Sequence, residues 1–446
     1  MSTSTPTGPT RIHVPVPAST SARASTRATA GAPRVRYVGV DLARFLAIAG
    51  MMATHLVAIS AMLPGLSPFE QTAGSVAQTL TSGIAAPLFA VLGGLSLVFA
   101  SRAPLRDGRP GAAISGILIR GAILVLIGML LGMMQVPIVV VLAYYGLAMI
   151  IAAPAILLPS WAIAGIAAVL AVAVPPLNAM ARSALGVVNE GGSVTFESFS
   201  GDPAGAIRGL FLTGEYPAVT WVVYLLIGIL IARAFVAATE RGSLRRTALV
   251  AAAAGAAVAA AAQGVSMWVV AHLDRFGFAV PEGVDPEMFR TMLVSPTFGA
   301  PFSADPWAML VATPHSGSPL DLLRTVGISL LVIGLLVAIF DGGRSRREPG
   351  FALNVFRSAG AAPLTIYSLH VIATALLVQP AMEALMLQDV PDPGTLPWYA
   401  IGMPAFGLQL AGAILIGAIL AGLHRRGPLE ALTSGTVRLL TGQRRR

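Results

Sequence analysis

The sequence contains no cysteine, and its 29 basic residues are all arginines, so lysine is absent as well. Without cysteine there is no disulfide framework, no thiolate nucleophile and no cysteine-based metal site. Without lysine there is no lysine amine for catalysis. Charged residues are scarce too, at 11% of the 446 residues, whereas a soluble chain has about a quarter. The scarcity of charge argues against a soluble fold, whereas we attribute the absence of lysine to genome bias.

Hydrophobic residues are abundant instead. They make up 55% of the chain, and the mean hydropathy is +0.78. The sequence pI of about 10.8 is of a kind often seen in nucleic-acid-binding proteins. Most arginines, however, lie at the ends of apolar runs and form no basic stripe with interleaved aromatics. This distribution indicates membrane topology, and we expect no nucleic-acid partner.

Ten apolar runs meet or approach the roughly 20 residues that a membrane-spanning helix needs. They cover residues 38–62, 80–101, 113–133, 137–157, 160–178, 217–238, 247–272, 320–340, 358–378 and 399–422. The run at 160–178 is the weakest, because Pro175 and Pro176 cut it short. The pattern predicts an all-α, polytopic membrane bundle of about ten transmembrane helices, lying in the lipid bilayer of the plasma membrane.

The distribution of arginine predicts the orientation of these helices. With the amino terminus inside, 24 of the 29 arginines lie in cytoplasmic segments or in the inner halves of the spans. The outer loops hold the other five, together with 14 of the 20 acidic residues. Both termini are therefore predicted to be cytoplasmic.

The chain is expected to form one membrane domain with two tails. Residues 1–36, rich in Ser, Thr, Ala, Pro and Arg, predict a disordered cytoplasmic tail. Residues 37–424 predict the transmembrane domain, and residues 425–446 a basic cytoplasmic tail. Two long outer loops, residues 179–216 and 273–319, contain too few apolar residues for a core. We expect them to act as lids or binding loops over an outward cavity.

An ionisable side chain at membrane depth costs at least about 2.5 kcal/mol on insertion scales, so each one needs a reason. The first span carries Asp41, Arg44 and His55. Arg44 shares a helical face with Asp41, and His55 lies about 40° around the helix from Asp41 and roughly 21 Å further along it. One stripe thus carries a charge pair at its cytoplasmic end and an imidazole past mid-membrane. The alternative is an interfacial ion pair and a core histidine.

Other polar side chains are expected near the depth of His55. Tyr367 and His370 lie on one face of the ninth span, and His315 lies just outside the eighth. A lone loop histidine is more often structural, but three histidines at one level favour a site. Further candidates for contacts to a substrate are Tyr144, Tyr145, Glu215, Tyr367 and Arg324.

On the inner side, Arg120 and Arg233 lie within or at the ends of their spans. Snorkelling to lipid phosphate is the alternative for each, and it is favoured for Arg233. Arg120 is deeper, and together with Arg44 it is expected to form an anion site at the cytoplasmic mouth. No P-loop, dinucleotide fingerprint or metal-spaced cluster of His, Asp and Glu occurs, so we expect no metal and no ATP-driven pump.

Several strings carry a family resemblance. The first is Gly39-Val40-Asp41-Leu42-Ala43-Arg44, followed by an apolar run to His55. The others are APLFAVLGGLS at 86–96, GEYP at 214–217 followed by Trp221, Tyr224, Gly228 and Arg233, PHSG at 314–317, LTIYSLH at 364–370 and GPLE at 427–430. In order and spacing they resemble the heparan-α-glucosaminide N-acetyltransferase-like membrane proteins and the bacterial YeiB-like proteins.

The resemblance implies an acyltransferase. Such enzymes take an acyl group from cytoplasmic acetyl-CoA or another acyl-CoA and deliver it to a sugar hydroxyl or amine on the far side. Here it implies an envelope glycan or glycolipid as acceptor. The candidates for donor binding are Asp41, Arg44, Arg120 and Arg233. The candidates for general-base or acyl-carrier chemistry are His55, His370 and His315.

The chain departs from the family at two positions. Phe45 stands where the family usually has glycine, and His55 stands where characterised relatives commonly have asparagine. The histidine that those relatives are thought to use lies in the following outer loop, where this chain has none between residues 56 and 271.

Two other functions stay open. A transporter or flippase for a lipid-linked or carboxylate-bearing solute would also use intramembrane charges and long outer loops. The sequence shows no inverted repeat that would favour it. A regulatory or scaffold protein would keep the fold without the activity. Homo-oligomerisation is equally open.

Overall fold

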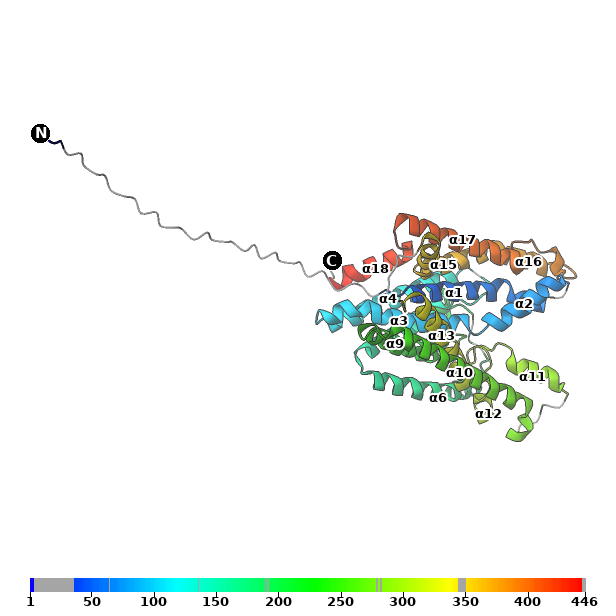
Figure 1. Ribbon diagram of the computed structural model, residues 1–446. Coiled ribbons are helices and arrows are strands. Elements are labelled where there is room, and N and C mark those ends of the chain that lie inside the picture. Colours follow the sequence, from blue (N-terminus) through cyan, green and yellow to red (C-terminus); the bar gives the residue numbers. More distant parts are fainter. Residues whose placement is uncertain are drawn as a thin grey trace. The chain divides into compact units, whose positions relative to one another are not determined.

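The computed structural model describes residues 1–3, 36–63, 65–134, 136–188, 190, 192–277, 280, 283–343 and 350–442. Within these residues the protein is helical, with no β-strand. From Tyr37 onward it forms one unit (Figure 1). Nearly all of the predicted disordered tail lies outside the described residues, as do parts of the segments at 273–319, 341–357 and 425–446.

The α-helices of the first half are α1 (Val38–Leu56), α2 (Pro68–Thr81), α3 (Ala85–Arg106), α4 (Pro110–Gly132), α5 (Leu142–Ala152), α6 (Ser160–Leu185), α7 (Phe196–Gly201), α8 (Pro203–Arg208) and α9 (Ala218–Glu240). Those of the second half are α10 (Leu244–Ala271), α11 (Pro286–Val294), α12 (Pro306–Met309), α13 (Pro319–Phe340), α14 (Phe351–Gly360), α15 (Pro363–Ala373), α16 (Gln379–Met386), α17 (Gly402–Leu423) and α18 (Pro428–Thr441). Many begin with proline, whose fixed φ suits the first helical position and whose missing N–H has no helical partner there.

The predicted polytopic helical membrane protein is confirmed. In the described part of the chain, nine helical stretches are long and apolar enough to cross a bilayer. The run predicted at 137–157 forms a shorter apolar helix, Leu142–Leu157, in which α5 continues into the 3-10 helix η2 (Ala153–Leu157). Every predicted span therefore corresponds to a helix, and only this one falls short of full length.

The prediction that Pro175 and Pro176 cut the fifth span short is wrong. Both prolines lie inside α6, which continues to Leu185. Membrane helices tolerate proline because neighbouring helices and local backbone adjustments satisfy the freed carbonyl groups. The extra turns carry Asn178 and Arg182, which are both buried.

Asn178 and Arg182 hold the two outer loops together. Arg182 donates to the carbonyl oxygens of Val188 and, at 2.8 Å, Gly214. It also donates to Oδ1 of Asn178 at 3.0 Å. The side-chain N–H of Asn178 donates to the carbonyl oxygen of Gly299 at 2.9 Å. The end of α6 therefore fixes the loop before α9 against the loop between α11 and α12.

The second outer loop has more of a core than its composition suggested. It was expected to lack one, but Leu293, Trp307 and Val311 pack against Val269 and Val270 of α10. Because this apolar cluster includes the end of α10, the loop extends the bundle and is not a separate domain.

Helices α3 and α9 approach each other so closely that glycine is required. A Cβ on Gly94 would lie 2.1 Å from the carbonyl oxygen of Leu225, and a Cβ on Gly228 would lie 2.1 Å from that of Val91. Small residues allow membrane helices to pack backbone against backbone, where lipid provides no hydrophobic driving force between helices.

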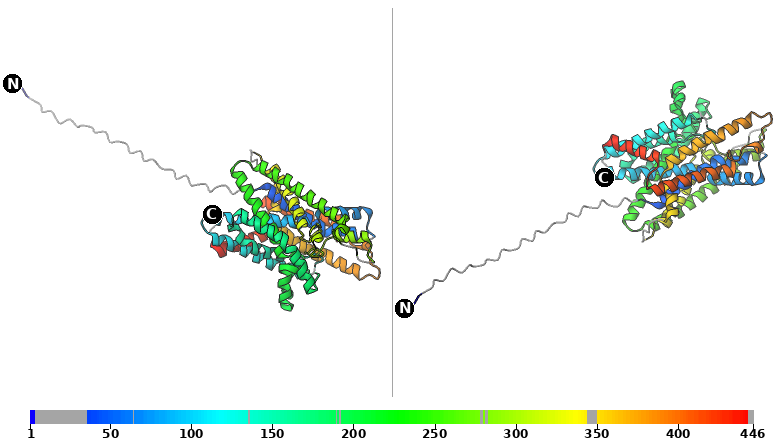
Figure 2. Two further views of the ribbon diagram at one scale, coloured as in Figure 1. Left: turned by 90° about the horizontal axis from the view of Figure 1, so that it is seen from below. Right: turned by 90° about the horizontal axis from the view of Figure 1, so that it is seen from above.

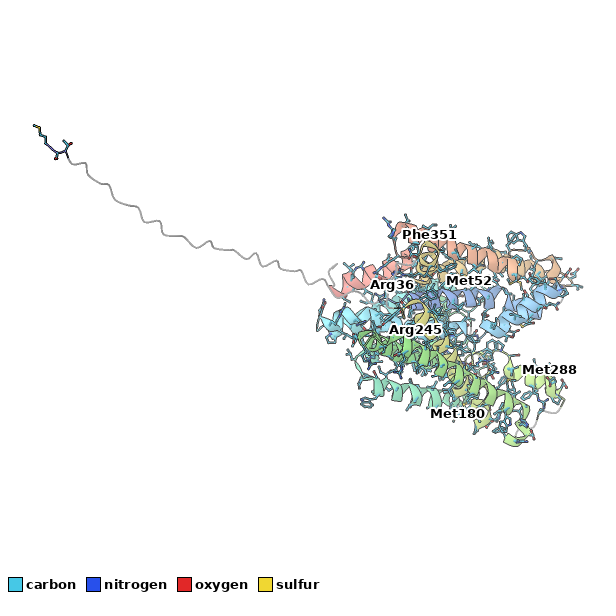
Figure 3. All side chains as sticks on the ribbon, viewed as in Figure 1. Arg36, Met52, Met180, Arg245, Met288 and Phe351 are labelled. Atoms are coloured by element: carbon cyan, nitrogen blue, oxygen red, sulfur yellow. The ribbon has the colours of Figure 1, made fainter. Side chains whose placement is uncertain are left out.

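One end of the bundle comprises the starts of α1, α4 and α10 and the ends of α3, α9 and α13, and we call it the arginine-rich end. There the two carboxylate oxygens of Asp341, just after α13, accept the backbone N–H groups of Val38 and Gly39 at 2.8 Å each. Figure 3 labels Arg245 toward this end and Met288 toward the opposite one. The long helices run lengthwise between the two ends in both views of Figure 2.

Replacing Gly94 with alanine is expected to destabilise the protein by about 1–3 kcal/mol, because the new methyl group overlaps the backbone of α9. Thermal unfolding of the purified protein in detergent measures the change. The matched control is Gly264→Ala in α10, where an added Cβ meets no atom within 4 Å. There alanine should be neutral or stabilising because of its helix propensity. Equal losses in the two variants would contradict the packing argument.

Candidate functional site

Two histidines meet between α1 and α15. Nδ1 of His55 lies 2.9 Å from Nε2 of His370. The ring planes are 5° from parallel and the ring centroids are 5.2 Å apart, so the rings meet edge to edge through these nitrogens. His370 is only 3% exposed. The sequence placed both histidines at the same depth, and the structure places them in direct contact.

Gln409 of α17 continues this contact into a chain of hydrogen bonds. Its Oε1 lies 2.6 Å from Nδ1 of His370. With the amide oxygen facing the ring, His370 donates from Nδ1 and must accept at Nε2. His55 then donates from Nδ1, and its own Nε2 keeps a lone pair. These hydrogen bonds therefore select the tautomer of His55 in which Nε2 is unprotonated.

Gln409 was not among the residues singled out from the sequence. A signal was present, since its side chain is the only polar one in α17, Gly402–Leu423. A lone amide in an apolar span needs a hydrogen-bonding partner on another helix. The sequence does not reveal that the partner is His370.

His55 also lines a small cavity. The walls come from α1, the end of α2, the start of α3, the segment before α5, α15 and the two outer loops. The polar lining residues are Thr54, His55, Thr81, Tyr216, His315 and Tyr367. The structure thus brings the three candidate histidines into one site. His55 and His315 line the cavity, and His370 contacts His55 through its ring nitrogen.

His315 reaches this cavity from a strained turn. Its φ is +63°, and Ser316 N donates to the carbonyl oxygen of Thr313 at 3.1 Å to close the turn. This backbone region favours glycine and costs other residues about 1–2 kcal/mol. The imidazole packs edge-on against Tyr216, with ring centroids 5.6 Å apart. Burial and the nearby Arg324 lower the pKa of His315 to about 4, so the ring is neutral at neutral pH.

Tyr367 and Tyr216 supply hydroxyl groups to the site. The backbone N–H of Val141 donates to the Tyr367 oxygen at 3.3 Å, which leaves the phenol hydrogen available as a donor. Tyr216 is hydrogen-bonded to the side chain of Glu215, a predicted substrate contact whose pKa is raised by burial. Tyr216 itself was overlooked as a site residue, although it lies in the GEYP string.

The two predicted tyrosines of α5 are not among the lining residues. Tyr144 donates to the carbonyl oxygen of Gly192 at 3.0 Å, and its ring packs edge-on against Tyr216. Tyr145 faces α3, where Gly93 makes room for it: a Cβ there would lie 1.8 Å from the Tyr145 hydroxyl oxygen. Tyr144 therefore supports the wall of the site, and Tyr145 packs against a neighbouring helix.

Arg324 lies behind the turn that carries His315. It donates to Oδ1 of Asp321 at 2.9 Å, and Oδ2 of Asp321 accepts the N–H of Gly317 at 3.1 Å. Its Nη1 lies 3.5 Å from Oε1 of Gln263. Its Nε is buried and has no hydrogen-bond partner in the described part of the chain. This ion pair braces the turn.

The first half of α1 carries the predicted charge pair. Arg44 donates to Oδ1 of Asp41 at 2.7 Å and to Ser96 of α3 at 3.0 Å. Arg357 of α14 lies 3.9 Å from Oδ2 of Asp41. One helix therefore joins this charged group to His55 at the cavity.

Arg233 does not join this group. It donates to the carbonyl oxygens of Ile156 at 2.8 Å and Leu158 at 2.7 Å, where the short helix ends before α6. It lies inside α9, and its hydrogen bonds tie this helix to the chain between η2 and α6.

Arg120 has different neighbours from those expected. Among the described residues, its charge interacts with those of Arg426, in the turn before α18, and Arg438, in α18. The expected neighbour was Arg44. No cluster of three or more His, Cys, Asp or Glu side chains able to hold a metal occurs in the residues that the structure describes.

Replacing His315 with glycine tests the strained turn and its pH dependence. Glycine adopts φ +63° without strain, so the variant should be at least as stable as the wild type at about pH 8. The pKa of His315 is about 4 in the fold and about 6.5 in an unfolded chain. The unfolded chain binds the proton first, so His315 reduces stability progressively as pH falls from about 6.5 to about 4.

Melting midpoints at about pH 8 and about pH 5 check this expectation, and the wild type should lose more than the variant. His424→Gly controls for backbone relief alone, since His424 also has a positive φ, of 52°, after α17. An identical loss in wild type and His315→Gly would contradict the assignment.

Comparison with known proteins identifies the family. A family model described as heparan-alpha-glucosaminide N-acetyltransferase, catalytic, matches residues 36–270, more than half of the 446 residues. No curated protein and no solved structure matches the chain. The match includes His55, whereas His315, His370 and Gln409 lie beyond it. The chain is a multi-pass membrane protein that belongs to the heparan-alpha-glucosaminide N-acetyltransferase catalytic family.

Proposed function

We propose that this protein transfers an acetyl or other acyl group from cytoplasmic acyl-CoA to a hydroxyl or amine of an extracytoplasmic envelope glycan or glycolipid. It would act in the plasma membrane, with the arginine-rich end facing the cytoplasm. The observation that carries the proposal is the hydrogen-bonded chain from Gln409 through His370 to His55 at the cavity. Buried ionisable groups in a membrane domain are expensive and usually functional.

His55 would act as the general base. Its Nε2 takes the proton of the acceptor hydroxyl or amine while that oxygen or nitrogen attacks the thioester carbonyl carbon. A C–O or C–N bond forms, the C–S bond breaks, and CoA leaves as a thiolate. The proton on His55 then passes to the sulfur, which gives free CoA and the acylated acceptor and restores the neutral histidine.

Neighbouring groups would assist this step. The free phenol hydrogen of Tyr367 is suited to donate to the thioester oxygen as it becomes negative. His370 accepts a hydrogen bond from His55 and so stabilises the imidazolium that forms. Neutral His315, held by its strained turn, would orient the acceptor that enters from the outer side.

Helix α1 would guide the donor. Arg44, held by Asp41 and Ser96, lies roughly 16 Å before His55 along the helix axis. The pantetheine arm would run between these two points. Phe45 packs edge-on against Phe356 of α14 with ring centroids 5.3 Å apart, and we propose that this pair forms one wall of the path. Arg233 and Tyr145 have no part in the proposal.

His55→Ala is expected to lower acyl transfer by about 10²- to 10⁴-fold, the usual contribution of a general base. The assay supplies protein in liposomes with acetyl-CoA and envelope sugars and follows free CoA thiol together with acylated sugar. His272→Ala, at the end of α10, is the matched control. Full activity in both His55→Ala and His370→Ala would rule the mechanism out. Solute uptake that needs no CoA would favour a transporter instead.

Gln409→Leu is expected to lower kcat about tenfold, because His370 loses the acceptor that fixes its tautomer. KM should change little, and the pH profile of kcat should shift. Gln409→Glu keeps an acceptor at this position and should restore much of the rate. Gln379→Leu is the control, since that amide bonds within its own helix α16, to Glu383 at 2.8 Å. A change in KM alone would contradict a positioning role.

A further inference from the structure

Helix α18 is fixed firmly against the bundle. The carboxylate of Glu430 accepts the N–H of Leu364 at 2.7 Å and the hydroxyl of Thr365 at 2.6 Å. At the other end of the helix, Arg109, just before α4, donates to the carbonyl oxygen of Thr441 at 2.8 Å. Most of the segment expected to be a basic tail is therefore an anchored helix at the arginine-rich end.

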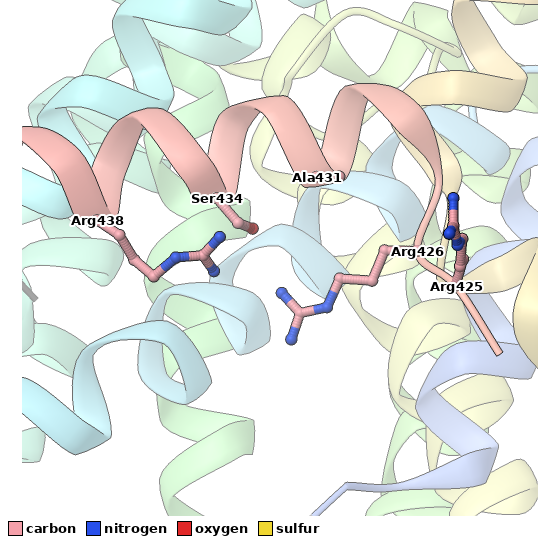
Figure 4. Close-up of a pocket in the computed structure, with 5 residues that line it drawn as sticks. All are labelled: Arg425, Arg426, Ala431, Ser434 and Arg438. Carbon is pink, nitrogen blue, oxygen red and sulfur yellow. The ribbon is translucent and has the colours of Figure 1, made fainter. Parts of the chain in front are cut away.

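One side of α18 lines a pocket. Its lining residues are Arg425, Arg426, Ala431, Ser434 and Arg438. Figure 4 shows Arg426 and Arg438 reaching from the same side of the helix toward a common space, with the hydroxyl of Ser434 between them. The small side chains of Ala431 and Ser434 leave this space open.

Helix α4 carries a further arginine, Arg120, whose charge interacts with two arginines of this pocket. Val437 of α18 is buried against α4, where a Cβ on Gly116 would lie 3.3 Å from its Cγ1. Arg120 follows Gly116 by one helical turn and so shares its face. Arg120 interacts electrostatically with Arg426 and Arg438. We name this site, formed by Arg120 and the five lining residues, the α4–α18 pocket.

The charges of the α4–α18 pocket call for an anion. Three of its five lining residues are arginines, and the carboxylate of Glu430 is bonded to α15. Arginines gathered around one space attract negative charge. Guanidinium groups match phosphate oxygens in pairs of parallel hydrogen bonds, and a hydroxyl such as that of Ser434 adds a further donor.

We propose that the α4–α18 pocket binds a phosphate group at the membrane surface. Two sources present this chemistry there: the ribose 3′-phosphate of CoA and the headgroup of an anionic lipid. The first source rests on the proposed function. It also fits the architecture, because Glu430 joins α18 to the start of α15 at Thr365, and that helix leads roughly 8 Å further to His370.

Equilibrium binding of CoA and of 3′-dephospho-CoA to the protein in nanodiscs tests the first source. Melting midpoints in phosphatidylcholine nanodiscs, with and without phosphatidylglycerol, test the second. We expect the wild type to bind CoA about tenfold more tightly than 3′-dephospho-CoA, the effect of losing one charged hydrogen-bonded group. Arg120→Gln and Arg438→Gln should each remove that difference.

Arg106→Gln is the matched control, because Arg106 lies exposed at the end of α3 and carries the same charge. It should leave the preference for CoA unchanged. A wild-type midpoint raised by phosphatidylglycerol and lost in Arg120→Gln and Arg438→Gln, without a preference for CoA, would support the lipid as the source. Absence of both effects in the wild type, or an equal effect of Arg106→Gln, would overturn the proposal.

The outcome is separate from that of the proposed function. A protein that shows the phosphate preference but transfers no acyl group would support the phosphate pocket and contradict the proposed function. Acyl transfer that depends on His55, with no effect of the CoA 3′-phosphate or of the anionic lipid, would support the proposed function and contradict the phosphate pocket.

Discussion

Polar groups inside a bilayer must find their partners within the protein, because lipid offers none, and this constraint governs how the helices are joined. His55, His370 and the amide oxygen of Gln409 are hydrogen-bonded in sequence across α1, α15 and α17. Arg44 and Ser96 likewise join α1 to α3. The bonds that hold the bundle together at these points are therefore the same bonds that build the candidate site.

The starts of these helices obey the same constraint. The first N–H groups of a helix have no partner within it and carry partial positive charge. Here carboxylates from distant segments accept them: Asp341 at α1, Glu430 at α15 and Glu70 at α17, where it accepts the N–H of Met403 at 3.1 Å. Each helix that carries His55, His370 or Gln409 is thus held at its start by a carboxylate from another segment. None of these three acidic residues lines the cavity.

Depth along the membrane could be predicted from the sequence, but the neighbours of each side chain could not. Counting residues along two spans placed His55 and His370 at one level, because the rise of a helix is constant. Which helices lie side by side depends on contacts such as that between Gly94 and α9, which no periodicity reveals. Arg120 was therefore expected beside Arg44, whereas the structure shows its charge interacting with Arg426 and Arg438.

The loops around the cavity show a second limit of prediction from the sequence. Pro175 and Pro176 were taken as the end of a span because proline breaks soluble helices. In the bundle the helix continues, and Asn178 and Arg182 reach the two loops that shape the cavity. Local propensity was overridden there by tertiary hydrogen bonds. Gln409 was missed for a related reason, because its role follows from its hydrogen bond to His370, a residue on another helix.

The turn at His315 extends the cavity beyond the part of the chain that matches the family model. The imidazoles at the cavity come from both halves of the polypeptide, and the segment that matches the family model supplies only His55. A fragment that ended between α10 and α11 would therefore lack both His315 and Tyr367 from the lining of the cavity.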